Sequence, residues 1–324
     1  MKHFEITDGK TVINLPSLTF GTASFEKSDN KAEYKSFLDR YCELGGDCID
    51  TARVYCAWIE GADGLSEQTI GEWLSEKGNS FRDKITLVTK GAHPRHDTIH
   101  ISRLSEAEIR SDIEESLKAL RTDYIDIYYL HRDDQSIPVE EIMPVLDKLV
   151  KEGKARTIGA SNWETKRIEQ ANNFAKKNGL TPFIISQINY SLAHLSRGSL
   201  GDMTQVCMDT EEFAWYLKND FPVMAFSPQA KGFFSKMISG EAMPTTLEHS
   251  YISTANLARL ARVKELSQKT GISPAAIVLG YLNSQPIKVS SVFGVTKLYQ
   301  LDDSMTAADV VFDKATLAFL DNRL

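Results

Sequence analysis

Eight short apolar runs recur along the chain, rich in β-branched and aromatic residues and separated from one another by amphipathic helical patterns. Such runs are typical of buried strands, and regular alternation of strand and helix is what a parallel sheet requires. We therefore predict an α/β protein with a single domain over residues 1–324, a (β/α)8 TIM barrel. The predicted strands are 18–21, 48–50, 85–90, 125–131, 155–161, 184–189, 222–227 and 289–294.

Apolar residues at helical spacing fill the intervals between these strands. Ser105 and Glu108 have the spacing of a capping box. The connections 56–65 and 229–255 are longer than a minimal turn, and loops of that length usually form lids or binding loops, so we expect both at the catalytic face. The segment 191–208 is predicted to be irregular. The predicted helices are 33–43, 66–76, 106–120, 139–152, 165–177, 210–219, 256–270 and 314–324.

Composition excludes several classes of protein. The formal net charge is −7, and no basic stripe interleaved with aromatic residues occurs, which argues against nucleic-acid binding. The first residues lack the apolar run of a signal peptide, and no stretch is long and apolar enough to cross a bilayer, so we expect a cytoplasmic protein without a membrane segment. The four cysteines show no C-x-x-C spacing, which favours free thiols.

Four polar residues stand at or just beyond the ends of the predicted strands: Asp50, Tyr55, Lys90 and His131. Any one of them alone would be an ordinary exit of a strand to solvent. In a parallel barrel, however, all strands point the same way, so the residues at their carboxyl ends converge on the face where barrel enzymes place their chemistry. The four residues are therefore our candidate catalytic set.

These side chains suit the delivery of a proton to a carbonyl oxygen. A tyrosine hydroxyl is a weak acid, but the ammonium of Lys90 would lower the pKa of Tyr55, and pairing with Lys90 would satisfy the buried charge of Asp50. His131 would hydrogen-bond the substrate oxygen. No side chain donates hydride, so a nicotinamide is required. Since neither G-x-G-x-x-G nor Y-x-x-x-K occurs, a barrel that binds the dinucleotide with its loops remains.

The chain resembles the aldo-keto reductases along nearly its whole length. It is more similar to the bacterial branch and to the β-subunits of voltage-gated potassium channels than to the mammalian aldose reductases. The matching motifs are 50–55, 64–71, 89–90, 129–132, 153–162 and 187–190. The resemblance implies that Tyr55 is the general acid, that Lys90 and Asp50 assist it, and that His131 orients the carbonyl.

The resemblance also implies a path for the cofactor, NADP(H) in preference to NAD(H). The nicotinamide carboxamide would be held by Ser161, Asn162 and Gln187, beside Asp50. Phe226 would stack on the ring. The other implied cofactor contacts are Gly21 and Thr22 near the nicotinamide, Ser227, Gln229 and Gly232 along the pyrophosphate, and Gly294, Thr296, Gln300, Asp303 and Ser304 at the adenosine end. Lys236 and Lys297 are candidates for a 2′-phosphate contact, with an ordinary surface lysine as the alternative for each.

Two tryptophans are candidates for apolar walls of the substrate pocket: Trp58, in the loop after Tyr55, and Trp163, next to Asn162. For each, packing within its own loop is the alternative. The chain departs from the family pattern at Cys56, where a glycine usually follows the catalytic tyrosine, and at Gln229, where leucine is common. Asp303 and Ser304 replace the usual Glu and Asn.

We therefore expect an NADP(H)-dependent oxidoreductase that interconverts the carbonyl of a small aldehyde, ketone or sugar-like compound with an alcohol. A nucleotide-sensing regulatory subunit with little turnover is the alternative. A metal-dependent barrel hydrolase or isomerase using Asp50 and His131 is disfavoured, because His93, His96 and His100 fall in a polar loop with no matching histidines at strand ends, and no metal site is expected.

Overall fold

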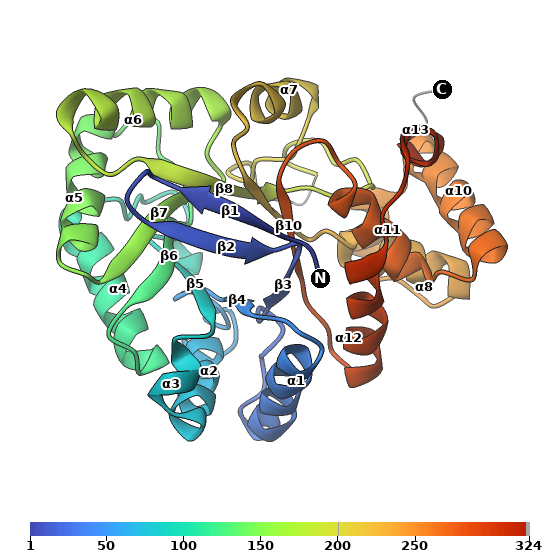
Figure 1. Ribbon diagram of the computed structural model, residues 1–324, viewed down its shortest axis with the longest axis horizontal. Coiled ribbons are helices and arrows are strands. Elements are labelled where there is room, and N and C mark those ends of the chain that lie inside the picture. The colour runs from blue at the N-terminus through green and yellow to red at the C-terminus, as the bar shows by residue number, and fades with distance from the viewer. Residues whose placement is uncertain (200, 322–324) are drawn as a thin grey trace.

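Eight parallel strands close into a barrel, surrounded by helices, in the computed structural model, which describes residues 1–199 and 201–321 (Figure 1). Neighbouring strands follow the chain order from β3 to β10, and β10 pairs with β3 to close the ring. The predicted TIM barrel is confirmed, and each predicted strand ends within one residue of an observed one. The barrel strands are β3 (Leu18–Gly21), β4 (Cys48–Asp50), β5 (Thr86–Gly91), β6 (Ile125–Leu130), β7 (Ala155–Ser161), β8 (Phe183–Asn189), β9 (Val223–Phe226) and β10 (Val289–Phe293).

The helices pack their apolar stripes against the outside of the barrel. The predicted cap of α4 is present, since the Ser105 hydroxyl accepts a hydrogen bond from the backbone N–H of Glu108. The α-helices are α1 (Lys31–Glu43), α2 (Leu65–Lys77), α3 (Asn79–Arg82), α4 (Glu106–Leu120), α5 (Val139–Lys151), α6 (Thr165–Asn178), α7 (Thr210–Asn219), α8 (Phe233–Ser239), α9 (Thr245–Tyr251), α10 (Thr254–Thr270), α11 (Pro274–Asn283), α12 (Leu298–Met305) and α13 (Lys314–Asp321). The predicted last helix extends to 324, and residues 322–324 lie outside the described part of the chain.

An antiparallel hairpin that was not predicted precedes the barrel. Its strands are β1 (His3–Thr7) and β2 (Val12–Pro16), and it lies across one end of the barrel (Figure 1). Because β3 starts directly after β2, the covered end is that of the strand amino termini. Ile6, Ile13 and Leu15 are buried there against side chains from inside the barrel. The hairpin therefore closes the end opposite to the predicted catalytic face.

The two predicted loops differ in outcome. The segment 56–65 contains only turns before α2 begins. The segment 229–255 was predicted as a loop, and this is wrong, because it contains the short 3-10 helix Ala230–Gly232 followed by α8 and α9. Glycines in the left-handed region flank α8 on both sides, with φ of 84° at Gly232 and 76° at Gly240. These glycines of the segment 229–255 therefore mark the ends of a helix and not a continuous loop.

The buried carboxyl group of Glu67 on α2 gives the fold a pH dependence. Its side chain is 0% exposed, accepts a hydrogen bond of 2.6 Å from the Thr89 hydroxyl, and has its pKa raised by burial to about 7. Such a group keeps its proton in the folded chain while the unfolded chain loses it. Its contribution to stability therefore falls as the pH rises from about 4.5 to about 7.

We predict that Glu67→Gln removes this part of the pH dependence and stabilises the protein by roughly 3 kcal/mol at pH 8, since no buried carboxylate then has to ionise. Urea unfolding at several pH values from 4.5 to 8 measures the effect. The control is Glu76→Gln on the exposed side of the same helix, which should leave the profile unchanged. Parallel profiles for wild type and Glu67→Gln would contradict the prediction.

Candidate active site

The four predicted catalytic residues meet at the carboxyl ends of three adjacent strands. Asp50 is the last residue of β4, Lys90 lies near the end of β5, and His131 directly follows β6. Tyr55 comes from the loop after β4, which is short enough to return its side chain to the end of that strand. Asp50 and Lys90 are both only 1% exposed. The four side chains therefore form one cluster in the mouth of the barrel.

The ammonium group of Lys90 organises this cluster. Its Nζ donates to Asp50 Oδ2 at 2.7 Å, to the carbonyl oxygen of Thr51 at 2.7 Å and to the Tyr55 hydroxyl at 3.1 Å. A lysine ammonium carries three N–H donors, and all of them are used. A buried charge is tolerated only when it is paired and hydrogen-bonded, and this arrangement meets both conditions.

His131 lies beside Tyr55. The two ring centroids are 6.0 Å apart at an interplanar angle of 71°. The backbone at His131 is fixed on both sides, because its N–H donates to Gly91 O at 2.9 Å and its carbonyl accepts from Arg132 Nη1 at 2.8 Å and Asn162 Nδ2 at 3.2 Å. An imidazole held in this way can donate to, or accept from, a substrate oxygen near the tyrosine hydroxyl.

The protonation of Tyr55 differs from the sequence-based expectation. Burial raises the pKa of Tyr55, and although the positive charge of Lys90 works to lower it, the net pKa lies above its ordinary value. For Lys90, burial works to lower the pKa, but the attraction of Asp50 and Tyr55 raises it overall. The predicted lowering of the Tyr55 pKa by Lys90 is therefore present, but burial, which the sequence does not give, outweighs it, and Tyr55 is protonated beside a charged lysine.

Three side chains predicted for the nicotinamide carboxamide adjoin this cluster. Gln187 on β8 donates from Nε2 to Asp50 Oδ1 at 2.8 Å, so both oxygens of that carboxylate are engaged. Ser161 is the partner of Gln187 in the register between β7 and β8. Asn162 follows with φ of 59°, and its Nδ2 lies 3.2 Å from Ser161 Oγ. A hydroxyl and two amides thus lie together at one side of the barrel mouth, as a carboxamide group requires.

The turn after β9 forms a second region of predicted cofactor residues. Phe226 ends the strand, and within the next six residues Ser227, Ala230, Lys231 and Gly232 all have φ between 50° and 84°. Such left-handed conformations are strained for residues other than glycine and persist where the surroundings enforce them. The N–H groups of Ala230 and Gly232 donate within the turn, to Ser227 O and Gln229 O at 2.9 Å each. The predicted pyrophosphate residues Ser227, Gln229 and Gly232 thus lie together in one tight turn at the carboxyl end of β9.

The remaining predicted cofactor residues lie near β3, α8 and α12. Gln229 Nε2 donates to Ser304 Oγ at 2.9 Å, which joins the turn after β9 to α12. Gln300 Oε1 accepts from Thr296 N at 2.9 Å, so it helps to fix the start of that helix. Gly21 ends β3 and Gly294 directly follows the adjacent strand β10, while Thr22 Oγ1 donates to the carbonyl of Asp50. Asp303 is half-buried on α12, and Lys236 is half-buried on α8.

The two tryptophans predicted for the substrate pocket lie in different environments. Trp58 is 45% exposed, its ring is 6.3 Å from that of Tyr55, and its indole N–H donates to Glu26 Oε1 at 3.1 Å. Trp163 is 0% exposed, so the expectation that it lines a substrate pocket is wrong. Its indole N–H donates to Arg132 O, and its ring packs edge-on against Phe183 at 5.2 Å, which makes it a core residue.

Cys56 has a backbone conformation that favours glycine and a buried side chain. Its φ is 72°, in the left-handed region that glycine adopts without strain. The side chain is fully buried, its Sγ donates to Phe25 O at 3.1 Å, and burial raises the pKa of the thiol to about 11. Cys56 is therefore a packed, unreactive thiol, and all four cysteines are free as predicted.

The sequence did not identify His93 as part of the site. It was assigned to a polar loop, but it is only 8% exposed, and its ring centroid lies 4.8 Å from that of His131 at an angle of 71°. The small apolar residues Gly91 and Ala92, between Lys90 and His93, are the only signal that the chain stays inside at this point.

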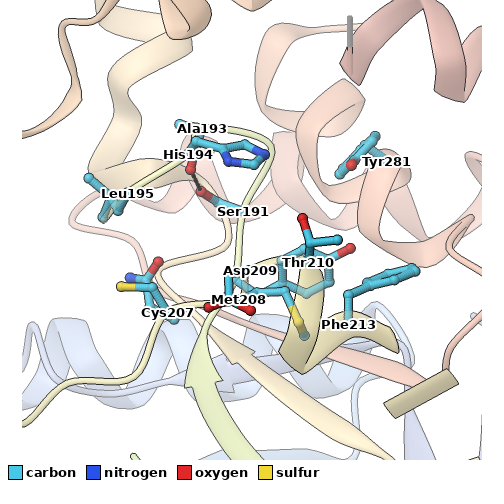
Figure 2. A pocket seen from close by; sticks show the side chains of 12 residues that line it. Ser191, Ala193, His194, Leu195, Cys207, Met208, Asp209, Thr210, Phe213 and Tyr281 are labelled. Atoms are coloured by element: carbon cyan, nitrogen blue, oxygen red, sulfur yellow. Dashed lines mark hydrogen bonds between the residues drawn. The ribbon is translucent and has the colours of Figure 1, made fainter. Parts of the chain in front are cut away.

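The irregular segment 191–208 borders a separate small cavity at the end of β8, away from the catalytic set. Figure 2 shows Ser191, whose hydroxyl donates to Ala193 O, facing Asp209 and Thr210 from α7 and its approach. The cavity measures about 30 Å³, which is enough for ordered water. Among the described residues, no three His, Cys, Asp or Glu side chains are placed to hold a metal, and no helix has the length and hydrophobicity of a membrane span.

We predict that the buried pair of Asp50 and Lys90 is coupled in stability. Asp50→Asn removes the charge opposite a buried ammonium and should lower the free energy of unfolding by about 3–5 kcal/mol, whereas Asp50→Asn combined with Lys90→Met should lose less than the single variant. Urea unfolding measures all of these proteins. The control is Asp63→Asn, which breaks an exposed pair with Arg53 and should cost about 1 kcal/mol or less. A double variant less stable than Asp50→Asn alone would refute the coupling.

The comparisons with known proteins agree with this arrangement. The model of the aldo/keto reductase family matches residues 17–323. An uncharacterized oxidoreductase, YrpG, of Bacillus subtilis is 28% identical over 97% of this chain and 94% of its own length. An aryl-alcohol dehydrogenase [NADP(+)] of Phanerodontia chrysosporium is 28% identical over 91% and 76%, and a probable voltage-gated potassium channel subunit beta of Arabidopsis thaliana is 26% identical over 94% and 90%. The chain therefore belongs to the aldo/keto reductase family, and it is an oxidoreductase that acts on carbonyl and alcohol groups.

Proposed function

We propose that the protein is an NADP(H)-dependent reductase of a small aldehyde, ketone or sugar-like carbonyl compound, with Tyr55 as the general acid and, in the oxidative direction, the general base. The observation that carries this proposal is the set of three hydrogen bonds made by Lys90, which join the tyrosine hydroxyl to a buried carboxylate. A protonated tyrosine next to a charged ammonium is equipped to release its proton when negative charge develops nearby.

Each catalytic side chain has one task in this proposal. Tyr55 gives its hydroxyl proton to the carbonyl oxygen of the substrate. Lys90, 3.1 Å from that hydroxyl, stabilises the phenolate that remains, and Asp50 keeps Lys90 charged. His131 hydrogen-bonds the same carbonyl oxygen and directs it toward Tyr55. In the oxidative direction the phenolate takes the proton of the alcohol.

A bound nicotinamide supplies the hydride in this reaction. Ser161, Asn162 and Gln187 would hold its carboxamide, and Phe226 would pack on the ring. The left-handed turn at 227–232 would receive the pyrophosphate, while the residues of α12 and its approach would meet the adenosine. The preference for NADP(H) is supported by Lys236 on α8 and by the relative named aryl-alcohol dehydrogenase [NADP(+)]. Trp58, exposed beside Tyr55, would form one wall of the substrate pocket.

We predict that Tyr55→Phe lowers kcat by at least 100-fold and leaves nucleotide affinity unchanged, because only the transferred proton is removed. Quenching of tryptophan fluorescence by NADPH gives the affinity, and loss of NADPH absorbance with 4-nitrobenzaldehyde gives the rate. Turnover within a few fold of wild type would show that Tyr55 is not the acid.

We predict further that Lys236→Ala weakens NADPH binding about tenfold and leaves NADH binding unchanged, because only the former carries the 2′-phosphate. The same fluorescence titration with each nucleotide measures both affinities. Lys264→Ala, an exposed lysine on α10, should alter neither and controls for general electrostatics. Equal losses for NADPH and NADH in Lys236→Ala would contradict a 2′-phosphate contact.

A nucleotide-sensing regulatory subunit is the second candidate, and the specific observation in its favour is the potassium-channel-subunit relative, which spans 94% of the chain. Such a subunit would bind the nucleotide as the reductase does, but it would turn over a carbonyl substrate slowly or not at all. NADPH retained through gel filtration, together with no turnover of any aldehyde or ketone tested, would favour it over the reductase.

A further inference from the structure

We propose that His93 is a positioning residue for the proposed reaction: its ring holds the imidazole of His131 in the orientation that meets the substrate carbonyl. This inference rests on the proposed function, because it needs His131 to act on the substrate. His93 comes from the loop after β5, whereas His131 follows β6, so the contact joins two neighbouring strand ends above Lys90.

The ring contacts of His131 are the first step of the argument. Its imidazole lies edge-on to two aromatic neighbours, Tyr55 with centroids at 6.0 Å and His93 at 4.8 Å, each at an angle of 71°. Rotation of the imidazole about its side-chain torsions would break both contacts. The shorter contact is the one with His93, so this residue limits the orientation of His131 more closely than the catalytic tyrosine does.

The orientation of His93 itself is fixed by its own loop. Its Nδ1 is 2.6 Å from the carbonyl oxygen of Pro94, and since a carbonyl only accepts, Nδ1 carries the proton and donates. Arg103 Nη1 donates to the carbonyl of His93 at 3.2 Å. A side chain bonded to the next peptide and a carbonyl bonded to a guanidinium leave the ring little freedom to turn.

The backbone before His93 is strained and is held in that state by α4. Ala92 has φ of 60°, a conformation that residues with a side chain rarely adopt, and its N–H donates to Asp112 Oδ2 at 2.7 Å. The same carboxylate of Asp112 forms an ion pair of 2.6 Å with Arg103. Backbone strain of this kind persists only where the surroundings enforce it, and it is concentrated at functional sites.

A cavity lies next to His93, so the imidazole of His131 depends on the ring of His93 for support on this side. His93 lines a polar cavity of about 590 Å³ between the loop after β4 and the start of α4, together with Arg53, Arg103 and Asp112. Loss of the ring would therefore leave His131 beside this cavity without its contact to His93.

A kinetic double-mutant cycle tests the proposal. His93→Ala should lower kcat for 4-nitrobenzaldehyde about tenfold or more with unchanged NADPH affinity, and His131→Asn should lower it further. If His93 acts through His131, the double variant should be no slower than His131→Asn alone. Additive losses, or wild-type kcat in His93→Ala while His131→Asn is slow, would overturn the role of His93 and leave the proposed function intact. An active Tyr55→Phe would instead mark a failure of the proposed function.

Two further measurements separate positioning from general structural damage. His93→Phe restores an aromatic ring and should recover most of the kcat lost in His93→Ala, while equal losses in the two variants would contradict positioning by the ring. His100→Ala, in the same loop but exposed, is the matched control and should leave kcat unchanged. In the wild-type protein, NMR cross-relaxation between the ring protons of His93 and His131 should be detectable, and its absence would refute the contact even if the variants do not fold.

Discussion

The buried ion pair between Lys90 and Asp50 is the interaction on which the site depends. A lysine at this depth keeps its charge only because the carboxylate is 2.7 Å away, and the pair then determines the positions of its neighbours. The remaining N–H groups of Lys90 hold Thr51 and Tyr55, and the second oxygen of Asp50 holds Gln187. Through these bonds one charge pair links β4, β5 and β8. The same ion pair therefore positions both the side of the site predicted for proton transfer and the side predicted for the nicotinamide.

Much of the fold could be predicted from the sequence because the strands of a parallel barrel are buried on both faces, which makes them continuous apolar runs. The elements that were missed break this rule in identifiable ways. Val12–Pro16 alternates exposed and buried residues, and a turn containing Asp8 and Gly9, which is a typical hairpin signal, joins it to β1. The helix Pro274–Asn283 is buried almost all round, so no polar face marks its period.

The properties of the candidate site could also be predicted only in part from the sequence. The rule that strand ends converge was enough to group Asp50, Tyr55, Lys90 and His131, but the degree of burial is a property of the folded chain. Burial reverses the expected direction of the Tyr55 pKa, turns Trp163 into a core residue, and places His93 against His131 instead of in solvent. In each case the residue type and its position along the chain were read correctly, and the missing quantity was how many neighbours the fold packs around the side chain.

The hairpin β1–β2 restricts how water and protons reach the interior of the barrel. With Ile6, Ile13 and Leu15 packed into the amino-terminal end of the barrel, that end of the interior is closed to water, so Lys90 and Asp50 exchange protons with solvent from the carboxyl-terminal face, where Lys90 also lines the cavity beside His93. A ligand bound over that face would slow this exchange.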